Sequence, residues 1–239
     1  MHSNLFPFCT RLRALGIRVT ILSTGLLLER DAPRIVRTAD DVIVSLDGPP
    51  EVHDRIRCVP GVFDRLMGGV RTVHGLQPEF PVSGRSVVQR ENYHCLRATA
   101  RTAQQIGLRS ISFLAADVAS PAFNHSDGWR PEQQVRVALS EEDLPCLEAE
   151  IGALLEEWRG DPFLIDGPEK LHRVVQHYRA HLGLCEPVAP RCNAPWVSAV
   201  IETGGVVRPC FFLSARWSCG TRIGVCGEQP RGAGIPRQP

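Results

Sequence analysis

Residues 42–57 have the sequence VIVSLDGPPEVHDRIR, an apolar run followed directly by a polar turn. Val42–Leu46 is short and rich in β-branched residues, which is typical of a strand buried inside a parallel sheet. Asp47-Gly48-Pro49 then ends this strand. A strand that is buried on both faces needs helices to cover it, so helices are expected on either side of it along the chain.

Short apolar runs and helical patterns alternate on both sides of this strand. Further strands are predicted at Ile17–Leu22, Val82–Gln89 and Arg109–Leu114. Helices are predicted at Leu5–Leu15, Leu27–Thr38, Pro60–Gly75 and Tyr93–Ile106. This alternation predicts an α/β domain with a parallel sheet.

Two further helices are expected after residues 116–139, which are polar and loop-like. They cover Glu141–Arg159 and Pro168–Leu182. Ser140 and Asp143 have the spacing of N-cap and N3 residues, which predicts a capping box where the first of these helices begins.

The composition changes near residue 184, where proline, cysteine and short β-like runs such as Trp196–Ile201 replace the helical pattern. We therefore predict a large α/β domain with a helical extension at residues 1–184 and a small cysteine-rich α+β domain that begins at 185–212. Residues 213–239 lack apolar periodicity and are predicted to form an irregular tail.

Charge and hydropathy exclude several classes of function. The chain has 239 residues, 27 basic and 26 acidic, so its formal net charge of +1 gives no reason to expect binding to nucleic acid or to an anionic membrane. It has no apolar stretch of the length that spans a bilayer, and its first residues lack a signal-peptide pattern. A cytoplasmic location is the default expectation.

Nine cysteines are many for a cytoplasmic chain of this size. An odd number without a secretion signal argues against a disulfide framework. The four earliest are expected to be small core residues, and they are Cys9, Cys58, Cys95 and Cys146. The crowding of the other five toward the carboxyl terminus favours a metal site there.

Polar side chains follow three of the predicted strands, where parallel α/β folds bind their ligands. Asp47 is able to accept hydrogen bonds from two vicinal ribose hydroxyls, and Ser45 and Thr24 add hydroxyl partners. Arg90 has the planar fork that pairs with a carboxylate. Each residue also has a simpler interpretation, because an Asp-Gly pair is common in turns and an arginine commonly forms a surface ion pair.

Taken in order, these strand ends resemble the radical S-adenosylmethionine superfamily. The matching segments are S-T-G at 23–25, S-L-D-G with H-D-x-I-R at 45–57, and V-V-Q-R-E-N at 87–92 before the strand I-S-F-L. The resemblance implies a partial (β/α)6 barrel and S-adenosylmethionine as cofactor. It places Ser45 and Asp47 near the ribose, Arg90 and Asn92 near the methionine part, and Phe113 and Leu114 beside the adenine. Thr24 matches the turn that the family has after its third strand.

The pattern C-x12-G-x4-C from Cys192 through Gly205 to Cys210 resembles the opening of the auxiliary iron–sulfur domain called SPASM. This resemblance implies that both cysteines bind one auxiliary 4Fe–4S cluster, since such clusters are held by thiolates. The simpler alternative is a pair of core cysteines in a small β-hairpin.

The chain departs from the family pattern at both ends. It has no C-x3-C-x2-C motif, whose three thiolates hold the radical-generating 4Fe–4S cluster, and no Gly-Gly-Glu-Pro turn. We therefore expect an amino-terminal truncation that removes the first strands of the barrel. After Phe212 only Cys219 and Cys226 remain, and the arginine-, glycine- and proline-rich tail favours a frameshifted translation over a designed tail.

The resemblance implies an enzyme family whose members modify a peptide or a small-molecule cofactor precursor by radical chemistry. Because the cluster motif is absent, this chain is expected to be inactive on its own. The alternative is a non-catalytic module that binds a nucleoside or serves as a scaffold.

Overall fold

The computed structural model describes residues 4–120, 129–188, 192–202, 206–211 and 217–218. The chain divides into two compact units. The first unit comprises Met1–Val118 and Arg130–Val188, and the second comprises Ala119–Trp129 and Ala189–Pro239. Each unit is considered by itself below.

The first unit is built on a four-stranded parallel sheet with the strand order β1-β2-β3-β4. The strands are β1 (Thr20–Ser23), β2 (Asp41–Ser45), β3 (Val82–Val88) and β4 (Ile111–Ala115). Each pairs with the next one along the chain, so every connection is a crossover that carries helical structure. The α/β fold with a parallel sheet is therefore confirmed.

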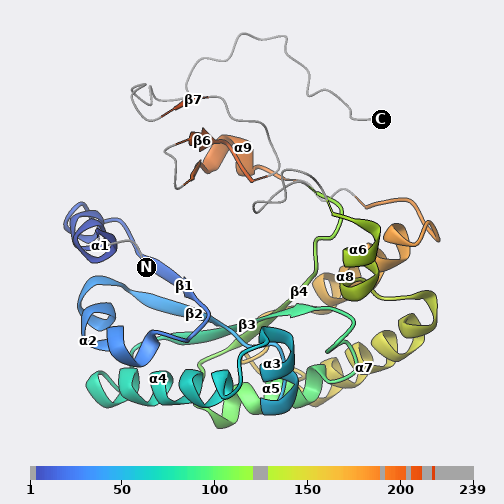
Figure 1. Cartoon of the computed structure of the whole chain (residues 1–239), viewed down its shortest axis with the longest axis horizontal. Coiled ribbons are helices and arrows are strands. Elements are labelled where there is room, and N and C mark those ends of the chain that lie inside the picture. The colour runs from blue at the N-terminus through green and yellow to red at the C-terminus, as the bar shows by residue number, and fades with distance from the viewer. Residues whose placement is uncertain (1–3, 121–128, 189–191, 203–205, 212–216, 219–239) are drawn as a thin grey trace. The chain divides into compact units, whose positions relative to one another are not determined.

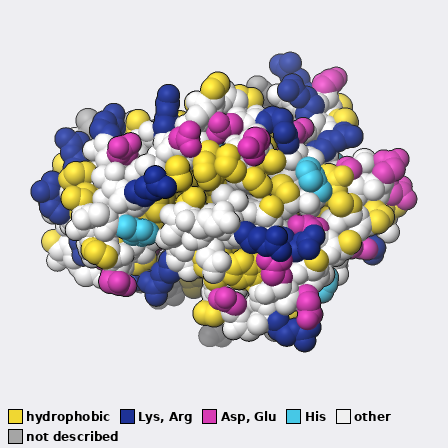
Figure 2. Space-filling view, turned by 90° about the horizontal axis from the view of Figure 1, so that it is seen from below, with side chains coloured by type: hydrophobic (Ala, Val, Ile, Leu, Met, Phe, Trp, Pro, Cys, Tyr) yellow, Lys and Arg dark blue, Asp and Glu magenta, His cyan; other side chains and the backbone are white. Residues whose placement is uncertain are grey.

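Helices cover one face of this sheet (Figure 1). They are α2 (Leu28–Thr38), α3 (Pro50–Arg57), α4 (Val62–Leu76), α5 (Leu96–Gln105) and α7 (Leu144–Glu157), while α1 (Leu5–Ala14) lies beside β1. Their outer surface carries basic and acidic side chains interspersed with each other (Figure 2). A mixed surface of this kind agrees with the small net charge of the chain.

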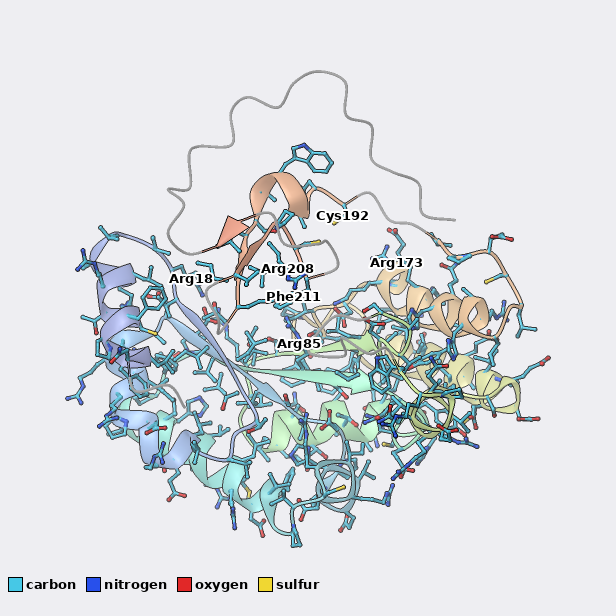
Figure 3. All side chains as sticks on the ribbon, turned by 45° about the horizontal axis from the view of Figure 1, so that its top comes forward. Arg18, Arg85, Arg173, Cys192, Arg208 and Phe211 are labelled. Carbon is cyan, nitrogen blue, oxygen red and sulfur yellow. The ribbon has the colours of Figure 1, made fainter. Side chains whose placement is uncertain are left out.

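The two faces of the sheet differ sharply in burial. Toward the helices, Val42, Val82 and Phe113 are completely buried. On the opposite face, which we call the open face, Leu22 is 64% exposed and Arg85 is half-buried near the middle of the sheet (Figure 3). The helices and the sheet thus form two layers with one core between them. The open face of the sheet does not contribute to this core.

The chain continues beyond β4 into three helices, α6 (Pro131–Val137), α7 and α8 (Pro168–His181). Asp166 ties the approach to α8 to the sheet, because its carboxylate accepts a hydrogen bond from the Phe113 backbone N–H at 2.5 Å. The buried Tyr178 hydroxyl donates to the Val88 carbonyl at 2.5 Å and accepts from the Ala116 N–H at 3.1 Å. Burial raises the pKa of this phenol, so it stays protonated and keeps donating.

The second unit contains short elements, α9 (Ala194–Val197), β5 (Val200–Ile201), β6 (Val206–Arg208) and β7 (Trp217–Ser218). The three strands form an antiparallel sheet in the order β5-β6-β7. Their register pairs Val200 with Arg208 and Val206 with Ser218.

Several local predictions need correction. Of the four early cysteines predicted to be core residues, Cys9 is buried and Cys95 is half-buried, but Cys58 and Cys146 are exposed. The segment 50–57, where no helix was predicted, forms α3, because Pro50 begins a helix at its first turn. The predicted loop at 116–139 contains α6, whose first residue is also a proline. The predicted β-like run Trp196–Ile201 starts inside α9 and becomes a strand only at Val200.

The capping box of Ser140 and Asp143 is confirmed, with the Asp143 carboxylate accepting from the Ser140 N–H at 2.8 Å. In the part of the chain that the structure describes, no helix is long and apolar enough to span a bilayer.

Candidate functional site

The carboxyl ends of β1, β2 and β3 meet at one edge of the sheet because the strands are parallel. Gly25 shapes the first of these ends. Its φ of +85° lies in the left-handed region, and a Cβ there would lie 2.5 Å from Leu66 Cδ1 of α4. The Gly25 N–H donates to the Ser23 hydroxyl at 3.1 Å, which closes the turn. The exposed Thr24 is thereby held at the edge.

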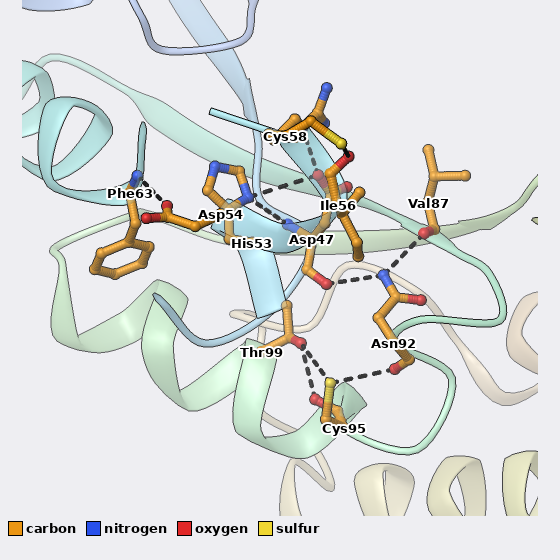
Figure 4. A network of polar contacts seen from close by, with 11 residues as sticks. Asp47, His53, Asp54, Ile56, Cys58, Phe63, Val87, Asn92, Cys95 and Thr99 are labelled. Atoms are coloured by element: carbon orange, nitrogen blue, oxygen red, sulfur yellow. Dashed lines mark hydrogen bonds and ion pairs between the residues drawn. The ribbon is translucent and has the colours of Figure 1, made fainter. Parts of the chain in front are cut away.

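Asp47 occupies a buried polar network at the end of β2 (Figure 4). It is 1% exposed, and its Oδ2 accepts a hydrogen bond from Arg57 Nε at 2.6 Å. Burial raises the pKa of the Asp47 carboxyl, but contacts with His53 and the Arg57 guanidinium lower it more, so the net pKa lies below the ordinary value. The carboxylate is therefore ionised and already occupied by a partner from α3.

His53 is the second buried member of this network and is 0% exposed. Its Nδ1 accepts the Asp47 backbone N–H at 3.2 Å and lies 3.5 Å from Asp47 Oδ2. Its Nε2 is buried and has no partner among the described residues. The ring meets Phe63 edge-on, with centroids 6.2 Å apart, so His53 packs α3 against α4.

Asn92 connects the ends of β2 and β3. Its Nδ2 donates to the Asp47 carbonyl at 2.8 Å and to the Val87 carbonyl at 3.0 Å. Its Oδ1 accepts the Gln89 N–H at 2.7 Å. The side chain is 0% exposed, and both of its N–H groups and its oxygen have partners within the protein. Asn92 therefore positions the two loops that surround the site.

The other predicted residues differ in their access to the open face. Ser45 and Leu114 are half-buried there, and Arg90 is exposed at the rim with its Nη1 donating to the Val135 carbonyl at 3.0 Å. Phe113 is 0% exposed and faces the helices. A nucleoside fits the accessible set, because Thr24 and Ser45 offer hydroxyls, Leu114 offers an apolar surface and Arg90 offers a cation.

The predicted site residues thus form two groups. The accessible ones are Thr24, Ser45, Arg90 and Leu114, and the buried ones are Asp47, Asn92 and Phe113. Sequence reasoning gave no role to His53 and Arg57. The signal was present in H-D-x-I-R, where a histidine and an arginine follow the aspartate at positions +6 and +10 and return to it across one short helix.

Cys192 and Cys210 lie in the second unit, on either side of the strands β5 and β6. Cys192 is exposed and Cys210 is half-buried, and both thiols are free. Groups of three or more metal-binding side chains do not occur within the described ranges. The binding of a cluster by these two cysteines stays a prediction.

Sequence comparison finds relatives over part of the chain. A segment of 95 residues is 30% identical to an AdoMet-dependent heme synthase of Methanosarcina barkeri, and covers 38% of this chain and 27% of that protein. A segment of 110 residues is 26% identical to the protein of the same name from Oleidesulfovibrio alaskensis, and covers 45% of this chain and 28% of the relative. The matches thus span about a quarter of each relative. No protein-family model matches the chain.

Structure comparison extends the similarity to most of the chain. Streptococcus suis SuiB bound to the precursor peptide SuiA aligns with a TM-score of 0.58 at 11% identity, over 87% of this chain and 46% of that one. anSMEcpe with bound AdoMet and the Cp18Cys peptide aligns with a TM-score of 0.55 at 16% identity, over 87% and 57% of the two chains. Because the sequence identities are this low, these alignments show similarity of fold alone.

The first unit therefore has a partial radical S-adenosylmethionine α/β fold. The sequence relatives, both named AdoMet-dependent heme synthase, point to the same group independently of the fold. The sequence relatives and the fold together support a protein of the radical S-adenosylmethionine superfamily.

Proposed function

We propose that this chain provides the nucleoside-binding strand ends of a radical S-adenosylmethionine enzyme that modifies a peptide or a cofactor precursor. The observation that carries the proposal is the position of Ser45. Its side chain lies on the open face at the last residue of β2, at the same edge of the sheet as the exposed Thr24. Hydroxyls at the carboxyl ends of parallel strands are suited to a ribose.

The residues of this chain bind and orient the cofactor in this proposal. Thr24 and Ser45 hydrogen-bond the ribose, Leu114 packs against the adenine, and Arg90 pairs with the carboxylate of the methionine part. S-adenosylmethionine, when bound, supplies the radical chemistry. Asp47 and Asn92 are buried and are proposed to position the site without contacting the cofactor, because their hydrogen bonds hold the loop after β2 against the loop after β3.

The chain alone is proposed to be inactive in radical generation. The reason is the sequence, in which no three cysteines have the C-x3-C-x2-C spacing. In the alternative function, the same strand ends bind a nucleoside without any catalysis. Because the sequence lacks the C-x3-C-x2-C motif, nucleoside binding without catalysis is favoured for the isolated chain. The proposed binding site at the strand ends is the same in both cases.

The second unit is proposed to contribute half of an auxiliary cluster site through Cys192 and Cys210. Two thiolates are half of the usual four, so iron bound there is expected to be substoichiometric and labile. The boundary near residue 184, the irregular tail after residue 212 and a cytoplasmic location remain part of the same proposal.

A peptide is the preferred substrate class. SuiB and anSMEcpe, which share the fold, are described as bound to a precursor peptide and to the Cp18Cys peptide respectively. A small-molecule precursor is the second possibility, because the sequence relatives are named heme synthases.

Equilibrium dialysis of the full chain with S-adenosylmethionine tests the binding site. Ser45→Ala should weaken binding about fivefold, since a neutral hydrogen bond contributes about 1 kcal/mol. Thr20→Ala is the matched control, because Thr20 is an exposed residue on the same face but at the amino end of β1. Absence of binding by the unmodified chain, or equal weakening by both variants, would overturn the proposed site.

An assay for 5′-deoxyadenosine tests the proposed inactivity. The chain would be reconstituted anaerobically with iron and sulfide, reduced with dithionite and incubated with S-adenosylmethionine. No product is expected above the protein-free control. Formation of 5′-deoxyadenosine in multiple turnovers would show that the chain alone is catalytic.

A further inference from the structure

A second cavity opens on the first unit. It has a volume of about 290 Å³ and is lined by Arg18, Asp41, Ser83, Arg85, Arg109 and Ser112, among others. Asp41 is the first residue of β2, and Arg109 lies two residues before the start of β4. The cavity therefore extends from the amino ends of the strands as far as Arg85, next to the proposed nucleoside site at their carboxyl ends.

Arg85 is the central residue of this cavity. It lies on β3, where the register places it between Ser45 of β2 and Ser112 of β4 (Figure 3). Its Nε is buried and has no hydrogen-bond partner within the described part of the chain. Both neighbours in the row are serines, which do not neutralise a guanidinium. A buried N–H of a cation without an acceptor is unfavourable, so an anion beside Arg85 Nε would be stabilising.

The charges around the cavity do not supply that anion. Asp41 is its acidic residue, and Arg18 already occupies it through Nε at 3.0 Å and Nη2 at 2.6 Å. Within the described ranges, neither Arg85 nor Arg109 has a carboxylate within 4.0 Å. Three arginines thus face one carboxylate, and the cavity has an excess of positive charge.

Serine hydroxyls complete the lining. Ser110 Oγ donates to Ser83 Oγ at 2.9 Å, which leaves the Ser83 hydroxyl proton available for another acceptor. Ser112 is buried beside Arg85 in the row across the strands. Guanidinium and hydroxyl donors that converge on one cavity are the groups that bind carboxylates and phosphates.

We propose that this cavity binds an oxyanion group, either a carboxylate or a phosphate ester, carried by the substrate. Its volume is slightly below the range of pockets that hold whole ligands, so it accommodates a charged substituent of a larger molecule. The proposal goes beyond the nucleoside site. The cavity extends toward the amino ends of the strands, and its central Arg85 pairs in register with Ser45, so the two sites are adjacent.

The test measures the thermal unfolding midpoint of the full chain against inorganic phosphate and, separately, succinate, with sodium chloride at equal ionic strength as reference. Each anion that binds raises the midpoint as its concentration rises. Arg85→Gln should weaken the effect about tenfold or more. Arg71→Gln, an exposed arginine on α4 outside the cavity, is the matched control and should respond like the unmodified chain.

Two further measurements of the unfolding midpoint distinguish anion binding by Arg85 from a structural role of this residue. In chloride alone, Arg85→Gln should unfold at the same temperature as the unmodified chain or higher, since it removes a guanidinium whose buried Nε has no partner among the described residues. Arg109→Gln, at an exposed position before β4, should also weaken the anion effect and does not disturb a strand. A response to phosphate alone assigns a phosphate ester, and a response to succinate alone assigns a carboxylate. No response to either anion, or equal responses with and without Arg85, would overturn the proposal.

Discussion

Arg57→Met should destabilise the first unit, because it leaves the Asp47 carboxylate buried without its cation. Methionine keeps most of the aliphatic packing of the arginine and removes the guanidinium. Asp47 is 1% exposed, and its Oδ2 lies 2.6 Å from Arg57 Nε. A hydrogen bond this short between two charged groups is among the stronger polar contacts in a protein.

The structure sets the expected magnitude. Removing one partner of a buried ion pair costs about 3–5 kcal/mol. The Arg57 side chain is 27% exposed, so water screens the pair in part and the low end, about 3 kcal/mol, applies. Arg55→Met is the matched control on the same helix. Arg55 and its partner Glu91 have side chains that are 54% and 48% exposed, and the loss should be below about 1 kcal/mol.

The pH dependence gives the same pair a distinct signature. The folded-state pKa of Asp47 is lowered, so its stabilising effect is complete above its ordinary pKa and disappears as the pH falls through the lowered value. In Arg57→Met, burial without a cation instead raises this pKa, and protonation then relieves the variant as the pH falls. The difference in stability between the two proteins should therefore shrink from pH 7 toward pH 4.

Urea unfolding followed by circular dichroism at several pH values measures this difference. Adding Asp47→Asn to Arg57→Met removes the orphaned charge and should recover part of the loss at pH 7. If Arg57→Met stayed within 0.5 kcal/mol of the unmodified chain at pH 7, as roughly expected of a surface substitution, Asp47 would not depend on this pair. A difference that did not change with pH would refute the same reasoning.

Three further outcomes are expected. Gly25→Ala should destabilise the fold by about 2–4 kcal/mol in urea unfolding, because it combines a left-handed φ with a Cβ that overlaps Leu66; a change within 0.5 kcal/mol would be inconsistent with this turn. Tyr178→Phe should cost about 1–2 kcal/mol, since the Val88 carbonyl loses its buried donor, and an unchanged urea midpoint would contradict that role. Iron content after reconstitution should fall together in Cys192→Ser and Cys210→Ser, and independent behaviour would separate the two cysteines.

The strands and most helices were predictable from the sequence because each has a strong apolar period. Val42, Val44 and Leu46 are all 0% exposed, as an apolar run in a parallel sheet requires. Gly107 directly follows the predicted helix Tyr93–Ile106, and it has a φ of +85° two residues after α5 ends. An apolar run or a glycine after a helix predicts a strand or a helix end from neighbouring residues alone, without knowledge of the rest of the chain.

Short helices and buried polar partners were not predictable in the same way. α3 and α9 span 8 and 4 residues, which is too few turns for an apolar period to be recognised. Asp47 has the hydrogen-bonding capacity expected of a ribose ligand, but its use depends on Arg57, which returns to it only after α3 has formed. A single residue type does not reveal whether its partner is a ligand or another side chain.

The open face gives the strongest link between this sheet and binding. The register aligns Ser45, Arg85 and Ser112 in one row across three strands, and Val87 and Leu114 form an apolar pair beside it. A sheet face that only packs against protein gains most from apolar residues, because an unpaired guanidinium there opposes folding. A half-buried arginine between two hydroxyls, with a buried Nε that has no partner among the described residues, is instead understandable as a receptor for a charged group. The row therefore argues that the open face recognises a molecule with both apolar and anionic parts, with its anionic group directed at Arg85.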